Sequence, residues 1–127
     1  MLDALRSLLP KQTLRLETKL EGVAGFTGAG SFRYALSPAG SADYEAELRG
    51  VAGLRCELFA EGEFVATLAC RDGKVAAKFN SRLGDPEIRL DAGAVIEIRQ
   101  NGDVVLKGVL KPERTGAKPT KSNGCRI

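Results

Sequence analysis

Five charged side chains that could do chemistry lie close together in one segment, residues 81–93. The same segment holds two glycines and a proline, which indicate an irregular connection rather than a regular element. Loops held in place by a rigid scaffold often carry binding residues. The sequence therefore predicts a ligand-binding site of carboxylates and guanidinium groups, formed by Arg82, Asp85, Glu87, Arg89 and Asp91. Ion pairing at the surface is the alternative reading of these mixed charges.

Histidine is absent from the 127 residues, and its absence excludes several kinds of site. A Ser-His-Asp or Cys-His nucleophile cannot be built, and neither can a histidine-ligated metal centre or a histidine general base. The acidic residues of segment 81–93 also lack the spacing of an EF-hand loop and its glutamate at the twelfth position. We therefore expect no catalytic residue, no metal and no cofactor.

The three cysteines are better interpreted as thiols than as a disulfide framework. Cys56 and Cys70 fall on the apolar phase of alternating segments, where cysteine serves as a small buried hydrophobe. Cys125 lies near the C-terminus, and we expect it to be exposed. A reactive or metal-binding role is the alternative, although the chain has no Cys-x-x-Cys pair.

Alternation of apolar and polar residues begins at Thr13 and is typical of half-buried β-strands. Strands are predicted near residues 13–21, 30–36, 44–48, 54–60, 64–70, 75–79, 94–100 and 104–110. We predict an all-β fold, an antiparallel β-sandwich of about eight short strands. The predicted organisation is a short N-terminal helical segment over residues 1–12, the sandwich domain over 13–111 and a disordered basic tail over 112–127.

The Asp72-Gly73 pair indicates a two-residue type I′ turn between two of these strands. This turn places Leu68 opposite Ala77, so that the apolar residues of both strands share one face. The sequence therefore predicts a meander with a single core face, made of residues 54–60, 64–71 and 74–81.

Two further hairpins are predicted to turn through three-residue loops, 61–63 and 101–103. The first loop sets apolar residues opposite one another, pairing Ala60 with Phe64, Leu58 with Ala66 and Cys56 with Leu68. The second pairs Ile98 with Leu106 and Ile96 with Gly108. We expect Ile88 and Leu90 of the 81–93 crossover to plug the open end of the sandwich.

A nine-residue echo occurs in the sequence, because residues 17–25 and 45–53 match at six of nine positions. A weaker third copy spans residues 103–109. The shared glycine permits a bulge or a positive φ, so we predict equivalent strand corners. A ligand-binding repeat and chance similarity are the alternatives. The glycine-rich segment 22–30 lies between two predicted strands and lacks the G-x-G-x-x-G fingerprint, and therefore indicates a hairpin connection.

The net charge of +3 is placed unevenly along the chain. Residues 111–127 carry five basic residues and one acidic residue, whereas residues 1–110 are nearly neutral. Basic and acidic residues also interleave on the outward phase of the strands, which favours cross-strand ion pairs on a solvent-facing sheet. Because a nucleic-acid-binding domain needs a basic body, we expect a protein partner or self-association, and nucleic acid only in a weak contact through the tail.

No apolar run reaches the roughly 18 residues that a membrane helix needs. The N-terminus also carries charged residues inside its apolar stretch and lacks the pattern of a signal peptide. We therefore expect no membrane span and a soluble, cytoplasmic protein, or a secreted one if this chain is a trimmed mature form.

Two patterns within Arg49–Leu110 resemble small bacterial β-sandwich domains of unknown function akin to the chordin-type (CHRD) domain. The first is Val75–Phe79 after Asp72-Gly73, and the second is Gly102–Leu110. The resemblance implies a β-sandwich fold and a bacterial source. The histidine motif of the chordin-type domain is absent here, so no metal-related role and no functional residue carries over.

These observations together favour a non-catalytic β-sandwich interaction or scaffold module. The alternative is a small enzyme with a carboxylate and arginine site in the 81–93 crossover. An enzyme needs a concave pocket in which at least two titratable groups with shifted pKa values converge, whereas a binding module needs only a sheet face or a groove.

Overall fold

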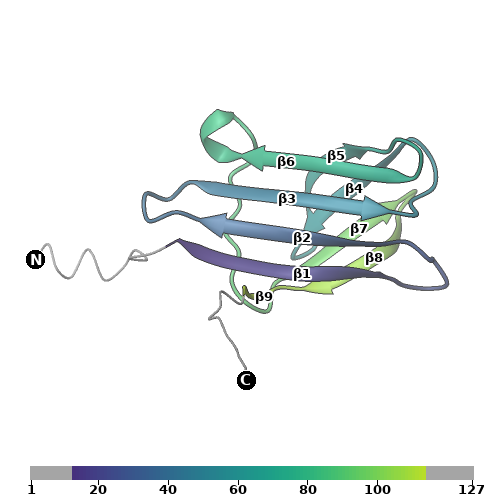
Figure 1. Cartoon of the computed structure of the whole chain (residues 1–127), viewed down its shortest axis with the longest axis horizontal. Helices are drawn as coiled ribbons and strands as arrows, with labels where there is room; N and C mark the ends of the chain where they lie inside the picture. The colour runs from purple at the N-terminus through teal and green to yellow at the C-terminus, as the bar shows by residue number, and fades with distance from the viewer. Residues whose placement is uncertain (1–12, 114–127) are drawn as a thin grey trace, which may run out of the picture.

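The computed structural model describes residues 13–113. The helical segment predicted over residues 1–12, most of the predicted tail and Cys125 lie outside these residues. Within them the chain forms nine β-strands and one short 3₁₀ helix (Figure 1): β1 (Leu14–Gly22), β2 (Ala29–Leu36), β3 (Ala42–Arg49), β4 (Arg55–Ala60), β5 (Glu63–Ala69), β6 (Lys74–Asn80), η1 (Ser81–Leu83), β7 (Val95–Gln100), β8 (Asp103–Val109) and β9 (Lys111–Pro112).

The strands form where apolar residues alternate with polar ones. In β3, for example, Tyr44, Ala46 and Leu48 are buried, and the residues between them lie toward solvent. A pleated strand places successive side chains on opposite faces, so this phase buries one face only. All the paired strands of the described residues are antiparallel. The predicted all-β class with antiparallel pairing is confirmed.

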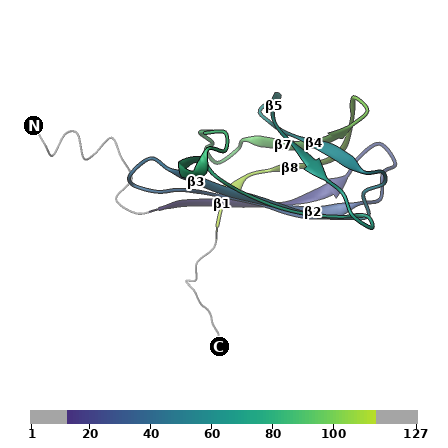
Figure 2. The same cartoon turned by 90° about the horizontal axis from the view of Figure 1, so that it is seen from above.

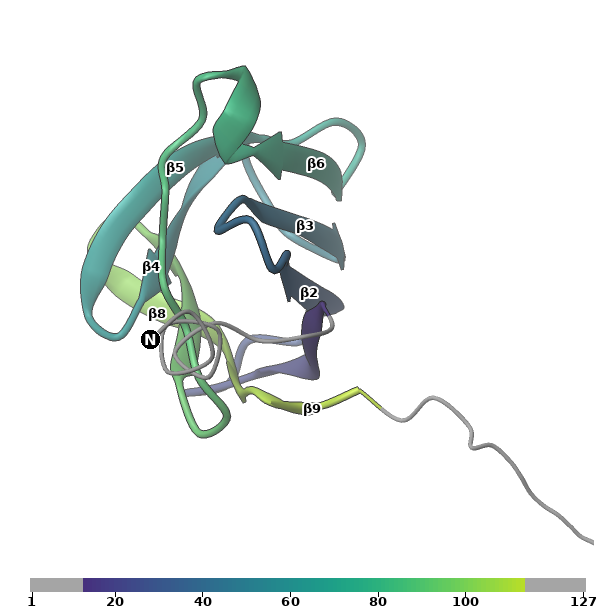
Figure 3. The same cartoon turned by 90° about the vertical axis from the view of Figure 1, so that its left-hand side faces the viewer.

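The strands of the described chain belong to one hydrogen-bonded sheet. Eight of them follow the order β5-β4-β7-β8-β1-β2-β3-β6, and β9 pairs with β1. The sheet curls so that a wall of β1, β2, β3 and β6 faces a wall of β4, β5, β7 and β8 (Figures 2 and 3). The architecture is a nearly closed, barrel-like sheet, whose end strands β5 and β6 approach each other without pairing along their length.

The last described residues extend the sheet beyond the predicted domain end at residue 111. Pro112 lies opposite Leu16 of β1, and the Glu113 N–H donates to the Arg15 carbonyl at 2.9 Å. The first residues of the predicted tail therefore belong to the folded domain.

The core fills the space between the two walls. Side chains of both walls are less than 2% exposed, and the largest of them are Tyr34, Phe32, Leu16, Leu20, Leu58, Leu68, Ile96, Ile98, Leu106 and Leu110. The predicted burial of Cys56 and Cys70 is confirmed, and both are free thiols whose sulfur atoms lie 3.8 Å apart. Burial raises the pKa of Cys56 to about 12, so this thiol is protonated at neutral pH.

The loop predicted over residues 61–63 is wrong by one residue. The β4–β5 hairpin turns through Glu61 and Gly62, whose φ values of 52° and 81° are those of a type I′ turn. Ala60 pairs with Glu63 instead of Phe64, and Phe59 pairs with Phe64. A register shift then leaves Val65 as an extra residue on β5, and this bulge restores the predicted pairs of Leu58 with Ala66 and Cys56 with Leu68.

The β7–β8 hairpin repeats this construction. Its turn is Asn101-Gly102, with φ values of 55° and 85°, rather than the predicted loop 101–103. A register shift follows, and the predicted pair of Ile98 with Leu106 is confirmed beyond it. In both hairpins the turn is one residue shorter than predicted and the bulge adds one residue, so the register of the core residues is unchanged. The alternation of core residues therefore could not reveal the short turn or the bulge.

The predicted meander of residues 54–81 is also wrong. The Asp72-Gly73 turn forms as expected, but β6 pairs along its length with β3 and not with β5. Ala77 therefore faces Ala46 rather than Leu68. β3 offers β6 partners that β5 lacks, since Phe79 stacks on Tyr44 with ring centroids 4.9 Å apart and Lys78 lies opposite Glu45.

The echoed segments take different places in the sheet. The first lies at the end of β1 and the second at the end of β3, where Val51 is buried. The third lies inside β8, and its Val109 is 43% exposed, so the predicted strand corner is wrong for this copy. The glycine-rich segment 22–30 connects the antiparallel strands β1 and β2, as predicted.

Candidate functional site

The crossover between η1 and β7 passes across one end of the barrel (Figure 3). Leu90 is buried and Ile88 is partly buried against the core, as expected for a plug. Two core tyrosines hold the segment. The Tyr34 hydroxyl donates to the Ile88 carbonyl at 2.8 Å and accepts from the Leu90 N–H at 3.3 Å, and the Tyr44 hydroxyl donates to the Pro86 carbonyl at 2.7 Å.

Both tyrosines stay neutral over the physiological range. Burial raises the pKa of Tyr34, and burial raises that of Tyr44 to about 12, with a further contribution from the nearby Asp85 charge. The rings sit on the apolar phase of β2 and β3, so the sequence placed them in the core but gave no sign of what their hydroxyls would bind. Their role is to position the crossover.

We expect Tyr44→Phe to lower the free energy of unfolding by about 1 kcal/mol, because it leaves the Pro86 carbonyl without its donor. The raised pKa adds a pH signature. Stability from this group is complete below the ordinary tyrosine pKa of 10.0 and declines as the pH rises toward about 12. Urea unfolding at pH 7 and at pH 11 measures both effects. A smaller loss at pH 7 than at pH 11 would contradict this assignment.

The five predicted site residues do not line one cavity. Glu87 and Arg89 form an ion pair at 3.1 Å, with both side chains more than half exposed. Arg82 and Asp91 are exposed. Asp85 is half-buried and caps the end of β6, because its carboxylate accepts from the Asn80 N–H at 2.8 Å. These contacts are a surface ion pair and the capping of a strand end.

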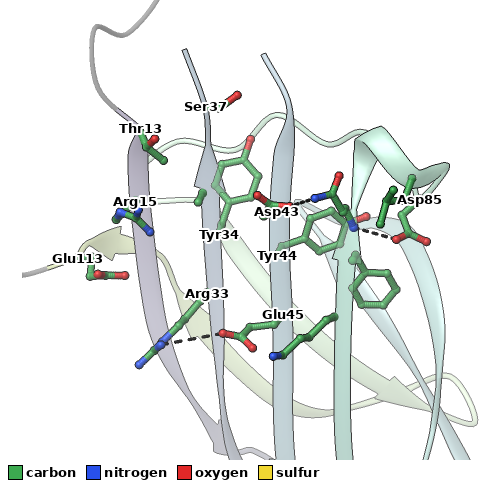
Figure 4. Close-up of a pocket in the computed structure, with 15 residues that line it drawn as sticks. Thr13, Arg15, Arg33, Tyr34, Ser37, Asp43, Tyr44, Glu45, Asp85 and Glu113 are labelled. Carbon is green, nitrogen blue, oxygen red and sulfur yellow. Dashed lines mark hydrogen bonds and ion pairs between the residues drawn. The ribbon is translucent and has the colours of Figure 1, made fainter. Parts of the chain in front are cut away.

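The outer face of β1, β2, β3 and β6 carries a hollow of about 580 Å³ (Figure 4). Of the five predicted residues, only Asp85 lines it. A row of alternating charges crosses the four strands there, made by Glu17, Arg33, Glu45 and Lys78 on directly opposite positions. Arg33 and Glu45 lie 4.0 Å apart, which is a loose, solvent-screened ion pair. The hollow itself is lined by charges of both signs: Arg15, Arg33 and Lys78, with Asp43, Glu45, Asp85 and Glu113.

The opposite wall carries four outward apolar side chains, which we name the apolar stripe: Phe64 of β5, Phe59 of β4, Val95 of β7 and Val109 of β8. The phenylalanine pair and the valine pair are offset along the strands, because Phe59 lies opposite Glu97 of β7. Phe64 is 58% exposed and Val109 43% exposed. The two phenylalanine rings meet edge to face, with centroids 5.8 Å apart, and Val95 lies opposite Val109.

An ionic group is fixed beside the stripe. The Arg99 guanidinium carbon lies 4.0 Å from the centroid of the Phe59 ring, and its Nη2 donates to Glu97 Oε1 at 2.6 Å. The stacked cation keeps one face of the Phe59 ring covered and holds the ring in place. The stripe is therefore a preorganised aromatic surface.

Sequence reasoning missed the stripe because it assigned Phe64 to the core. The two-residue turn places Phe64 on the solvent side, opposite Phe59, and the bulge at Val65 returns the next residues to the core phase. The signal was present in Glu61-Gly62, since a glycine at the second turn position favours the two-residue type I′ turn.

Comparison with known proteins gives no match, either to a protein-family model or to a curated protein. The resemblance to chordin-type domains therefore stays a prediction. Within residues 13–113, no helix has the length and apolar character needed to cross a membrane. The same residues contain no group of three or more His, Cys, Asp or Glu arranged to hold a metal ion.

Proposed function

We propose that this domain is a non-catalytic β-sandwich interaction module that docks another protein on the apolar stripe. The observation that carries the proposal is an exposed Phe64 ring that packs against Phe59, whose own ring is stacked under the Arg99 guanidinium. Exposed contiguous apolar residues on a folded domain mark interaction surfaces. Aromatic residues and arginine are also the types enriched at the energetic centres of protein interfaces.

The charges around the stripe support a protein partner rather than an anionic membrane or nucleic acid. Glu57 lies opposite Arg99, and Glu97 lies opposite Lys107. Arg99 and Lys107, the two cations nearest the stripe, thus each have an acidic neighbour, which weakens the attraction of this part of the face for phosphate groups. The partner that fits is a folded protein with an apolar surface and a polar rim. The alternative of an enzyme gains no support from segment 81–93, whose charged residues do not share one hollow.

We expect Phe64→Ser in the full chain to weaken partner binding about tenfold or more, as truncation of a central interface aromatic does. The matched control is Leu83→Ser, which removes an apolar side chain that is 82% exposed on η1, away from the stripe. The measurement is quantitative mass spectrometry of proteins cross-linked to each tagged variant in host extract, after urea unfolding has verified that both variants fold.

The proposal predicts a set of proteins that wild type and Leu83→Ser capture equally and Phe64→Ser does not. Equal capture by all three chains would contradict docking on the stripe. Loss with Leu83→Ser but not with Phe64→Ser would move the interface to the η1 end of the barrel.

A further inference from the structure

The two end strands of the sheet, β5 and β6, meet at the Asp72-Gly73 turn and then separate. Only the first rung between them is formed. The Arg71 N–H donates to the Lys74 carbonyl at 2.8 Å, and the Lys74 N–H donates to the Arg71 carbonyl at 2.9 Å. Beyond this rung β5 and β6 form no further backbone pairs within the described residues, and we name the unpaired stretch between them the seam.

The backbone groups that β5 directs into the seam follow from the alternation of an antiparallel strand. The Cys70 N–H donates to the Leu54 carbonyl, so residue 70 and the even positions before it face the β4 side. Residue 71 faces β6, as the formed rung shows. Thr67 and Ala69, both exposed, therefore direct their N–H and C=O groups into the seam.

The same reasoning applies to β6. Lys74 at one end bonds to Arg71, and the Asn80 N–H and C=O at the other end bond to Asp85 across the free edge. Between these ends, Ala76 and Lys78 point the same way, and both are exposed. Within residues 13–113, the four residues Thr67, Ala69, Ala76 and Lys78 have no hydrogen-bond partner for these groups.

The unpaired groups match in register across the seam. Counting from the formed rung of Arg71 with Lys74, a continued hairpin pairs Ala69 with Ala76 and then Thr67 with Lys78, the four residues whose groups are free. The core-facing residues agree as well, because Leu68 then lies opposite Ala77, which is only partly buried in the open structure. The free N–H and C=O groups of β5 and β6 could therefore form two further antiparallel backbone pairs.

We propose that the seam closes: β5 and β6 zip from the Arg71–Lys74 rung through Ala69–Ala76 to Thr67–Lys78, which completes the barrel wall. Asp85 on Asn80 and the bulge at Val65 end the zipper at that point. The open and closed forms are two states of one domain. Closure starts from a turn that is already made, so it orders almost no additional chain.

A strand from another molecule, or from the chain outside residues 13–113, could bind the same backbone groups, because unpaired edges accept strands. The formed first rung favours self-closure, since a guest strand has to enter between two strands that are already bonded at one end. The experiment separates the two.

The test uses the full chain with Cys125→Ser and a short reagent that alkylates two thiols at once. In the closed state Thr67→Cys/Lys78→Cys places two outward side chains directly opposite each other, whereas Thr67→Cys/Ala76→Cys places them diagonally. In the open state the second pair lies nearer the turn and is the closer one. We expect Thr67→Cys/Lys78→Cys to bridge about tenfold faster, because directly opposite side chains in a ladder are the nearest neighbours.

Ala76→Pro serves as the blocking variant in the Thr67→Cys/Lys78→Cys chain. It removes an N–H that points into the seam and keeps the pairing of β6 with β3, as proline on an edge strand does. We expect it to abolish the rate advantage. Equal rates for the two pairs, or faster bridging of Thr67→Cys/Ala76→Cys, would overturn closure. Slow amide exchange at Ala76 and Lys78 in the unsubstituted chain, without the rate advantage, would overturn it in favour of a guest strand.

Discussion

Leu68→Ala is expected to lower the free energy of unfolding by about 2–5 kcal/mol, the usual cost of truncating a fully buried leucine. Leu68 is 1% exposed and lies opposite Cys56 on the core face of β5. Its neighbour across the strand pair is small, and the next residue on the same face, Ala66, is small too. The cavity therefore cannot be filled by local repacking, and the loss is a large share of the roughly 5–15 kcal/mol of a typical domain.

The matched control is Thr67→Ala, one residue earlier on the same strand. Thr67 is exposed, so its truncation is expected to cost under about 1 kcal/mol. Urea unfolding of both variants measures the difference. Similar losses for the two would mean that β5 is buried on both faces or that its phase is inverted.

Gly108→Ala is expected to cost about 1–3 kcal/mol, the range of an overpacked core substitution. A Cβ at residue 108 would lie 2.5 Å from the Lys19 carbonyl oxygen and 2.7 Å from the Thr18 hydroxyl. One of these is backbone of β1, so relief requires that β8 and β1 move apart. Their pairing is short, Glu21 with Lys107 and Gly22 with Leu106, and it joins the two walls at this corner.

Lys107→Ala on the same strand provides the comparison, since Lys107 is exposed and its loss removes only surface charge. We expect a change within about 0.5 kcal/mol for this variant. Thermal or urea unfolding of both proteins measures the contrast. If Gly108→Ala unfolds at the same urea concentration as the unsubstituted chain, the close approach of β8 to β1 is wrong.

The sequence was sufficient for eight of the strands and, apart from residues such as Phe64 next to a turn, for the side of each strand that faces the core. Alternation is a local property, and it correctly placed Leu58, Leu68 and Ile98 inside. It also placed Cys56 and Cys70 together on the core face. These features follow from burying one face of a pleated strand, which leaves little freedom in the phase.

Partner choice between strands could not be predicted in the same way. The Asp72-Gly73 turn favours a hairpin, but β6 gains more from β3, where Phe79 stacks on Tyr44. That comparison involves residues 35 positions apart in the chain, and no local pattern encodes it. The placement of the five predicted binding residues has a related cause. The path of segment 81–93 is fixed by hydrogen bonds from the Tyr34 and Tyr44 hydroxyls to its backbone carbonyls. Its charged side chains do not determine that path, and they pair with neighbours or face solvent.

The exposed aromatic surface depends on a still smaller feature, the length of one turn. A three-residue loop and a two-residue turn followed by a bulge give the same core register for Leu58 with Ala66. They differ in where they put Phe64 and Val65: the two-residue turn leaves Phe64 exposed and buries Val65. The pattern of core residues does not distinguish the two loops. The apolar stripe forms because the hairpin has the two-residue turn.

Hydroxyl-radical footprinting of the full chain in host extract tests the interaction surface most directly. Oxidation is measured at Phe59, Phe64 and Val109 of the stripe and at Leu83, which is 82% exposed elsewhere on the domain. Docking on the stripe predicts that its residues lose most of their oxidation in extract compared with buffer, while Leu83 keeps its own. Unchanged oxidation of Phe64 together with protection of Leu83 would contradict the proposal.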